Sequence, residues 1–565
     1  MSRFAILQLG LLLVAAAGWG VGSLVWGAKD PPPDTRAQAQ KQMDEGNFKD
    51  AYALFRENCL HEKTDPKLVG QDLTRGVQCL RNLGRTTEVD EYVESTLAAH
   101  AKNWRLLQAA ADVYLTVDHY GSLVAGKFER GPHRGDSRVV NAQERDRIRA
   151  LQLLNTALPL ANQDDDKPAV AQFYLSLAQQ LLYYRSYNEA WRLQSLSNLT
   201  ELPDYEEGYY YERQYNGAPV DADGRPVFHQ QPKSWEAATT DGERWRWALA
   251  QAVENAPALL NQVRYEQATF YQNQFGPESM NFWGLGRFFG LPMSDDDTKQ
   301  NESGTYALHT LKETETIAKL ATGIKRFELP DEFNYLRILQ AIADNPATGY
   351  GDEALQALAH AFENRRQFTT AAKLWKRSIK EYGAAADSWK QARVAQIEGN
   401  WGRFEPLTTQ PAGQGATVDF RFRNATDVSF DAQAIKVDAL LNDVKAYLKS
   451  DPGQLNWEQL NIDNIGYRLV EKNEQKYLGD KVAQWKLPLV PRAGHFDKRV
   501  TVATPLQKAG AYLVTATVEG GNVSKIILWV ADTAIVHKHL SDQNYYYIAD
   551  AAGGEPIAGA NLEFF

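Results

Sequence analysis

The residues that could carry chemistry are few. The only thiols are Cys59 and Cys79, so a zinc site built from paired cysteines is excluded. His537 and His539 alternate within a predicted strand but have no third ligand nearby, and we interpret them as surface histidines. The glycine-rich stretch GLGRFFG does not follow a predicted strand, which argues against a dinucleotide-binding loop. Because the chain also lacks HExxH, GxSxG and Walker motifs, we predict no catalytic residues, no metal site and no cofactor.

The two cysteines have two interpretations. If the chain is exported, a disulfide between Cys59 and Cys79 is allowed, because oxidising compartments permit such bonds. It would require α-carbons roughly 4.4 to 6.8 Å apart. Two buried, unpaired thiols in a helical core also fit the sequence.

The N-terminal segment predicts export. Arg3 precedes an almost uninterrupted apolar stretch from Phe4 to Trp26. Residues 1–33 are therefore either a cleaved signal peptide or a retained anchor that crosses the inner membrane with residues 4–28, and the sequence leaves both open. We expect the protein to lie in the periplasm or the cell envelope, in contact with the membrane through this segment.

Length and composition favour a protein of several folded domains. Hydrophobic residues make up 44% and charged residues 23% of the 565 residues, as in ordinary globular proteins. The net charge of −10 comes from interspersed acids and bases. We expect no nucleic-acid partner, because phosphate binding requires clustered Lys and Arg.

Residues 34–399 resemble an all-α array of tetratricopeptide repeats. The repeat places small and bulky apolar residues at fixed positions in a helix–turn–helix unit of roughly 34 residues. The best instance begins DEALQALAHAF, a second begins FYLSLAQQLL, and GNFKDAYALF is a weaker one. The predicted repeat-packing residues are Phe48, Ala51, Phe55, Tyr187, Ala190, Leu358, Ala359, Phe368, Ala371 and Trp375. Each hairpin leaves an apolar face that only its neighbour can cover, so the repeats must stack.

A segment near residues 205–235 interrupts this array. It is rich in Tyr, Pro and Gly and predicts a long ordered loop or a small hairpin. Tyr209–Tyr211 either form a recognition surface, since exposed aromatic residues favour interfaces, or pack the loop onto the helices.

The sequence pattern changes near residue 400. Residues 400–416 are predicted to be a linker, and residues 417–533 a β-sandwich. Val418, Phe420 and Phe422 alternate with charged residues, as a half-buried strand requires. A helix from Asp438 interrupts the strands, which are predicted to resume at GYRLV, KRVTVAT, GAYLVTATV and VSKIILWVAD.

Tyr512 follows a glycine at the start of a late strand. This is the position of the corner tyrosine of immunoglobulin-like sandwiches, whose hydroxyl ties down the preceding loop. An ordinary half-buried strand tyrosine is the alternative.

Two sequence runs resemble the junction of the first two macroglobulin-type domains in bacterial alpha-2-macroglobulins. They are PLQKAGAYLVTATVEGGN and the C-terminal stretch that includes NYYYIADAAGGEPIAGANL. In the second run, Asp550, Gly553 and Gly554 shape the turn before a strand that begins at Pro556. The resemblance implies that residues 534–565 begin a second, incomplete sandwich domain. We accordingly expect the natural protein to continue beyond Phe565.

By this resemblance, the chain is the N-terminal scaffold and anchoring region of a non-catalytic protease-trapping inhibitor. The family's partners are proteases, which cut a bait segment and are entrapped, and many members also carry a thioester. Neither Cys59 nor Cys79 is followed by Glu and Gln at thioester spacing, so we expect no thioester and no bait segment in this chain. The alternative is an envelope adaptor whose helical array docks a partner protein.

Overall fold

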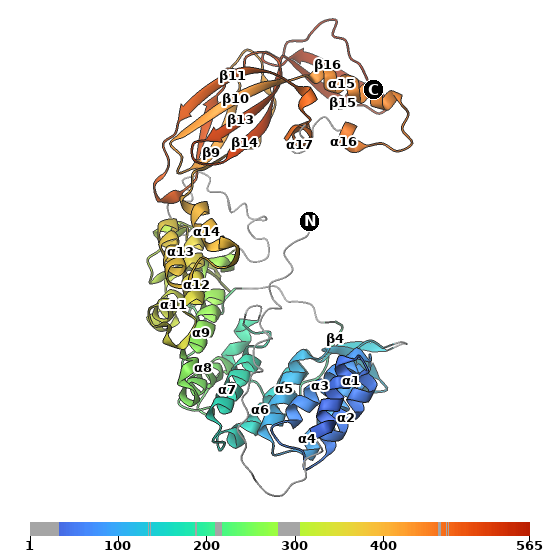
Figure 1. Ribbon diagram of the computed structural model, residues 1–565, viewed down its shortest axis with the longest axis vertical. Helices are drawn as coiled ribbons and strands as arrows, with labels where there is room; N and C mark the ends of the chain where they lie inside the picture. Colours follow the sequence, from blue (N-terminus) through green and yellow to red (C-terminus); the bar gives the residue numbers. More distant parts are fainter. Residues whose placement is uncertain are drawn as a thin grey trace. The chain divides into compact units, whose positions relative to one another are not determined.

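The computed structural model describes residues 33–564 except 134, 136, 187–188, 210–216, 281–305, 461–464, 471 and 473 (Figure 1). Helices dominate as far as residue 398 and strands dominate from residue 401 onward, which confirms the predicted order of a helical and a strand-rich region. The chain divides into two compact units: Met1–Tyr183 with Ser197–Tyr211, and Tyr184–Leu196 with Glu212–Phe565.

Among the described residues, no helix is both long and apolar enough to cross a membrane. The predicted leader, residues 4–28, lies outside the described residues.

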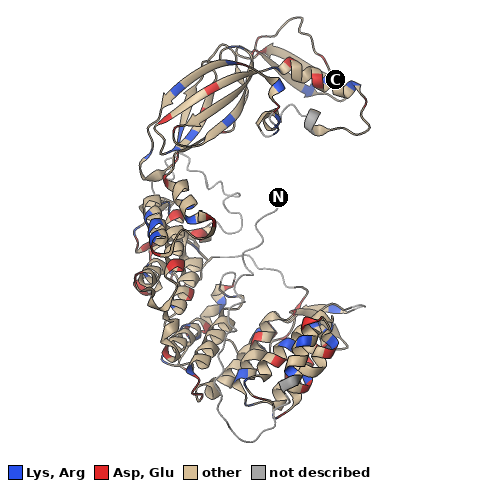
Figure 2. Cartoon of the chain, viewed as in Figure 1, with Lys and Arg blue, Asp and Glu red and all other residues tan. Residues whose placement is uncertain are grey.

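The first unit is built mainly from helices that each pack against a neighbour in the sequence. These are α1 (Pro33–Asp44), α2 (Phe48–Leu60), α3 (Val69–Asn82), α4 (Val89–Ala99), α5 (Trp104–Thr116), α6 (Gln143–Ala161) and α7 (Lys167–Leu182). Side-chain caps fix two of the helix starts: Asn103 accepts hydrogen bonds from the first turn of α5, and Asp166 accepts one from Ala169 of α7. Acidic and basic residues are interspersed along these helices (Figure 2).

A small antiparallel sheet interrupts the helices of this unit, where the sequence pattern predicted only helices. Its strands, in the order β2-β1-β3-β4, are β1 (Tyr120–Val124), β2 (Lys127–Arg130), β3 (Arg138–Asn141) and β4 (Glu206–Glu207). Ala125 and Gly126 join β1 to β2 and both have positive φ, as a two-residue hairpin turn of type I′ requires. The strands are too short to show clear alternation, so the prediction of an all-α region was wrong here.

The helical part of the second unit contains one hairpin. Its helices are α8 (Asp241–Asn255), α9 (Leu260–Phe275), α11 (Tyr335–Asp344), α12 (Gly351–Asn364), α13 (Phe368–Tyr382) and α14 (Trp389–Glu398), and the hairpin is β5 (Glu315–Leu320) with β6 (Gly323–Glu328). Helices α12 and α13 form the helix–turn–helix pair that the best repeat instance predicts. The β5–β6 hairpin is a second departure from the predicted all-α array.

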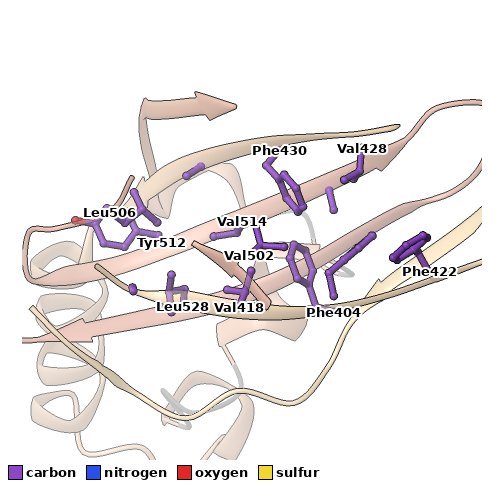
Figure 3. Close-up of a cluster of buried hydrophobic side chains, with 14 of the residues drawn as sticks. Phe404, Val418, Phe422, Val428, Phe430, Val502, Leu506, Tyr512, Val514 and Leu528 are labelled. Atoms are coloured by element: carbon purple, nitrogen blue, oxygen red, sulfur yellow. The ribbon is translucent and has the colours of Figure 1, made fainter. Parts of the chain in front are cut away.

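Two sheets make up the β-sandwich. A five-stranded sheet has the order β11-β10-β13-β14-β8, and a three-stranded sheet has the order β12-β9-β7. The strands are β7 (Trp401–Phe404), β8 (Gln410–Pro411), β9 (Thr417–Arg423), β10 (Asp427–Ile435), β11 (Leu478–Pro488), β12 (Lys498–Ala503), β13 (Gly510–Val518) and β14 (Val523–Ala531). Apolar side chains from both sheets fill the space between them (Figure 3).

The predicted linker, residues 400–416, contains strand β7 and so was placed wrongly. Phe404 of β7 lies in the sandwich core, with its ring centroid 5.4 Å from that of Phe420. Gly402 lets β7 approach this close, because a Cβ at that position would lie 2.4 Å from the Phe420 ring. The four residues of β7 are too few to show a strand pattern in the sequence, and the Pro- and Gly-rich residues that follow indicate a linker.

The residues between β10 and β11 cover the outer face of the five-stranded sheet. This segment contains α15 (Val437–Lys449), α16 (Trp457–Leu460) and α17 (Ile465–Val470). Ile465 and Leu469 of α17 pack against Ala511 and Leu513, which face away from the core side chains Tyr512 and Val514 because strand neighbours point in opposite directions. The predicted strand GYRLV is therefore a helix, consistent with the i, i+4 spacing of Ile465 and Leu469.

The chain then forms a two-stranded hairpin, β15 (Thr533–His539) with β16 (Asn544–Asp550). The Asp550 carboxylate accepts hydrogen bonds from the backbone of Ala552 and Gly553, and Gly554 takes φ of 72°. These contacts fit the turn role assigned to Asp550 and the glycines. Ile535 and Val536 are more than half exposed.

Candidate interaction sites

Of the residues that could carry chemistry, the structure describes Cys59, Cys79, His537 and His539. Among the described residues, no group of three His, Cys, Asp or Glu side chains is placed to hold a metal ion. His537 and His539 each have a ring nitrogen within 3.0 Å of the side-chain oxygen of Asn544. The GLGRFFG stretch lies outside the described residues.

Cys59 and Cys79 are buried, free thiols in the structure, which corresponds to the second of the two interpretations, and no disulfide joins them. The Cys59 sulfur accepts a hydrogen bond from the Tyr92 hydroxyl at 3.0 Å and donates to the Val69 carbonyl at 3.9 Å. These contacts engage the sulfur in the helical core. Burial raises the pKa of Cys59 to about 12 and also raises the pKa of Cys79, which favours the protonated thiol at neutral pH.

Most of the predicted repeat-packing residues lie in helix interfaces. Ala51 and Phe55 of α2 and Leu358, Ala359, Ala371 and Trp375 of the α12–α13 pair are all at most 1% exposed. Trp375 also donates from Nε1 to Glu363 at 2.6 Å. Phe48 is half-buried at the start of α2.

The second repeat instance differs from its prediction. Its first helix is α7, but Ala190 begins a short 3-10 helix, Ala190–Gln194, instead of a second α-helix. Tyr187 lies outside the described residues. Ala190 is nevertheless 3% exposed and so is still buried.

Phe368 has a contact that the repeat pattern did not predict. Its ring centroid lies 5.4 Å from that of Phe496, which belongs to the loop before β12 of the sandwich. A cavity of about 470 Å³ opens beside this pair and is also lined by His309 and Gln367. The residue predicted to fill a repeat turn therefore lies where the α12–α13 pair meets the sandwich.

Tyr512 makes the contact expected of a corner tyrosine. Its hydroxyl donates to the carbonyl of Lys508 at 2.8 Å, and its side chain lies in the sandwich core (Figure 3). The loop before β13 is thereby tied to the strand.

The inserted segment near residues 205–235 packs onto helices through its second half. Phe228 stacks on Phe333 with ring centroids 4.8 Å apart, and His229 is 6% exposed beside α8. Arg246 of α8 donates to the His229 carbonyl at 3.1 Å. Tyr209 is 55% exposed, while Tyr210 and Tyr211 lie outside the described residues.

A charged cleft in the first unit was missed by the sequence analysis. It has a volume of about 270 Å³ and is lined by α4, α5, β2, α6 and residues 202–205. Buried Arg130 of β2 is one of its lining residues and pairs with Asp90 of α4 and Asp146 of α6. Burial alone would lower the pKa of Arg130, but the two carboxylates raise it, so the side chain stays charged.

The lining residues of this cleft come from separate parts of the sequence and look individually like ordinary surface residues. The one local signal was the Ala125–Gly126 turn between short apolar and aromatic segments, which predicts a hairpin. Nothing in the local sequence brings Tyr205 to this hairpin, because that contact depends on the tertiary fold.

The chain matches no family model and no curated protein by sequence. Among solved structures, it is similar to a fragment of native alpha-2-macroglobulin from Escherichia coli spanning domains MG0-NIE-MG1, with 12% identity and a TM-score of 0.20 over 28% of this chain and 47% of that one. A fragment spanning NIE-MG1 gives 14% identity and a TM-score of 0.19, over 28% and 74% of the two chains. An assembly chaperone of RpL4, Acl4 (residues 1–338), gives 11% identity and a TM-score of 0.25, over 65% and 97%. All three likenesses are distant, and this chain spans about half the length of the first structure.

Proposed function

We propose that this chain is the non-catalytic scaffold region of an exported protease-trapping inhibitor of the alpha-2-macroglobulin kind. One observation carries the proposal. A β-sandwich in which the Tyr512 hydroxyl donates a hydrogen bond to the Lys508 carbonyl is followed directly by the β15–β16 hairpin and the turn at Asp550. The residues of this junction are those whose sequence resembles the family. The macroglobulin identity of residues 417–533 and 534–565 is part of the proposal.

In this role the chain positions other regions and does no chemistry itself. The two sheets of the sandwich share a continuous apolar core, which suits a rigid spacer. Cys59 and Cys79 of the helical region are buried and have raised pKa values, so covalent capture of a protease would fall to regions outside this chain. We further propose that residues 4–28 export the protein and bring it to the membrane, which a reporter active only outside the cytoplasm would test when fused to residues 1–40.

The experiment treats the natural protein that contains this chain with a limiting amount of an endopeptidase. Entrapment shields the protease from large substrates while leaving its active site open to small ones. We expect hydrolysis of a large protein substrate to fall in proportion to added inhibitor, and hydrolysis of a small chromogenic peptide to persist. Loss of both activities, or of neither, would contradict the proposal.

A second proposed role is an adaptor that docks an envelope protein through the helical region. The charged cleft of the first unit favours it, because the cleft is a preformed recess with polar groups at its walls. Photo-crosslinking in living cells from exposed positions of the first unit tests this role. A discrete crosslinked partner is expected, and the absence of any crosslink from all positions would refute it.

A further inference from the structure

The charges that line the cleft of the first unit are unevenly neutralised. Each of the five N–H groups of Arg130 is used in hydrogen bonds to Asp90, Asp146 and the Asp118 carbonyl. Arg149 forms a bidentate ion pair with Glu94, which also accepts a hydrogen bond from the Tyr114 hydroxyl. These acidic groups are therefore already committed to partners within the cleft wall.

Two cations of the cleft have no such partner within the described part of the chain. Arg145 donates to the carbonyl of Pro203 at 2.7 Å, and Lys127 is exposed on the edge strand β2. Among the described residues, no carboxylate forms an ion pair with either side chain. Because most of the guanidinium N–H groups of Arg145 remain available, the cleft presents uncompensated donors to an incoming anion.

One wall of the cleft is flat and aromatic. The guanidinium of Arg145 lies 4.7 Å from the ring centroid of Tyr205, and this ring stacks on Phe128 at 4.7 Å with an interplanar angle of 21°. The guanidinium of Arg130 lies 5.3 Å from the ring centroid of Phe128, so each of the two stacked rings contacts one arginine. Stacking between two cations fixes both rings, so an apolar group would meet a preorganised surface.

We propose that this cleft binds a short acidic segment of a partner polypeptide. A carboxylate of the segment pairs with Arg145 and Lys127, and a neighbouring apolar side chain packs on the Phe128–Tyr205 wall. The volume of about 270 Å³ is slightly below the roughly 300 to 1,000 Å³ of small-molecule sites, which suits a peptide anchor of one or two side chains. The inference rests on the adaptor role and is independent of the inhibitor role.

Binding to the full chain is measured by fluorescence anisotropy. The probe is a short fluorescein-labelled peptide of Asp and Glu with one central Leu, and the control probe carries Asn and Gln in place of the acids. We expect saturable binding of the acidic probe that weakens with added salt, and about tenfold weaker binding to the Arg145→Gln/Lys127→Gln variant. Arg138→Gln is the matched control, because this exposed arginine of β3 lies outside the lining and should bind within about twofold of wild type.

Lys127 is exposed, so a Lys127→Gln variant alone tests the cleft even if loss of Arg145 disturbs folding. Equal binding of the neutral probe, no saturable binding, or equal loss in Arg138→Gln would overturn the inference. Displacement of the probe by millimolar inorganic phosphate would assign the cleft to small anions and also overturn it. If the crosslinking experiment yields a partner while the acidic probe does not bind, the adaptor role survives and this inference fails.

Discussion

Lowering the pH from 7 to 5 should loosen the inserted segment where His229 packs against α8. The ring is 6% exposed, and burial lowers its pKa from about 6.5 to about 4, with Glu243 opposing the shift and Arg246 adding to it. Histidine in an unfolded chain has a pKa near 6.5, so below that pH the unfolded chain binds a proton that the folded chain does not. The stabilisation is therefore complete above about pH 6.5 and is lost as the pH falls toward 4.

A pKa difference of about 2.5 corresponds to about 3 kcal/mol of unfolding free energy, of which about 2 kcal/mol is lost by pH 5. Hydrogen exchange of α8 peptides, corrected for the intrinsic pH dependence of exchange, measures this as a local opening free energy. We expect the fall between pH 7 and pH 5 in the wild type and in His61→Gln, where the histidine is exposed, but a much smaller fall in His229→Gln. An equal fall in wild type and His229→Gln would refute the reasoning.

Three further predictions follow from single contacts. Asp352→Asn removes the carboxylate that lies 2.7 Å from the buried ammonium of Lys390. Chemical denaturation should show a loss of about 2 to 3 kcal/mol in the free energy of unfolding, less than for a fully buried pair because Asp352 is 26% exposed. A loss below about 0.5 kcal/mol would contradict this. Tyr512→Phe should cost about 1 kcal/mol and speed hydrogen exchange in the loop before β13, since one hydrogen bond to Lys508 is lost, whereas unchanged exchange would make Tyr512 an ordinary strand residue. Iodoacetamide at pH 8 should label neither Cys59 nor Cys79 in the native protein and both in urea without reductant, as mass spectrometry would show; no labelling in urea would instead reveal a disulfide.

Strands with long alternation were predictable from the sequence. Val418, Phe420 and Phe422 point into the sandwich core as expected, because a strand of this length fixes which face is buried. The α12–α13 pair was predictable for the same reason. The buried residues Leu355, Leu358 and Phe362 recur at helical spacing in α12, and Ala371, Trp375 and Ser378 do so in α13. In each case the periodic signal extends over a whole element.

The elements that were missed are short or depend on distant partners. Phe404 of strand β7 is buried against Phe420, its partner on the neighbouring strand β9. Helix α17 was mistaken for a strand because the five-residue segment GYRLV is too short to distinguish the two periods. The cleft could not be predicted, since Arg130, Arg145 and Tyr205 meet only once the hairpin, α6 and residues 202–205 have folded together. A pattern of nearest neighbours carries no information about such contacts.

The central claim, that this chain belongs to a protease trap, is tested most directly by gel filtration of the natural protein after incubation with an endopeptidase. Entrapment without covalent inactivation predicts that activity toward a small peptide substrate elutes with the inhibitor at high mass and resists a large proteinaceous active-site inhibitor. The account would be contradicted if all of the protease activity eluted at the position of the free enzyme.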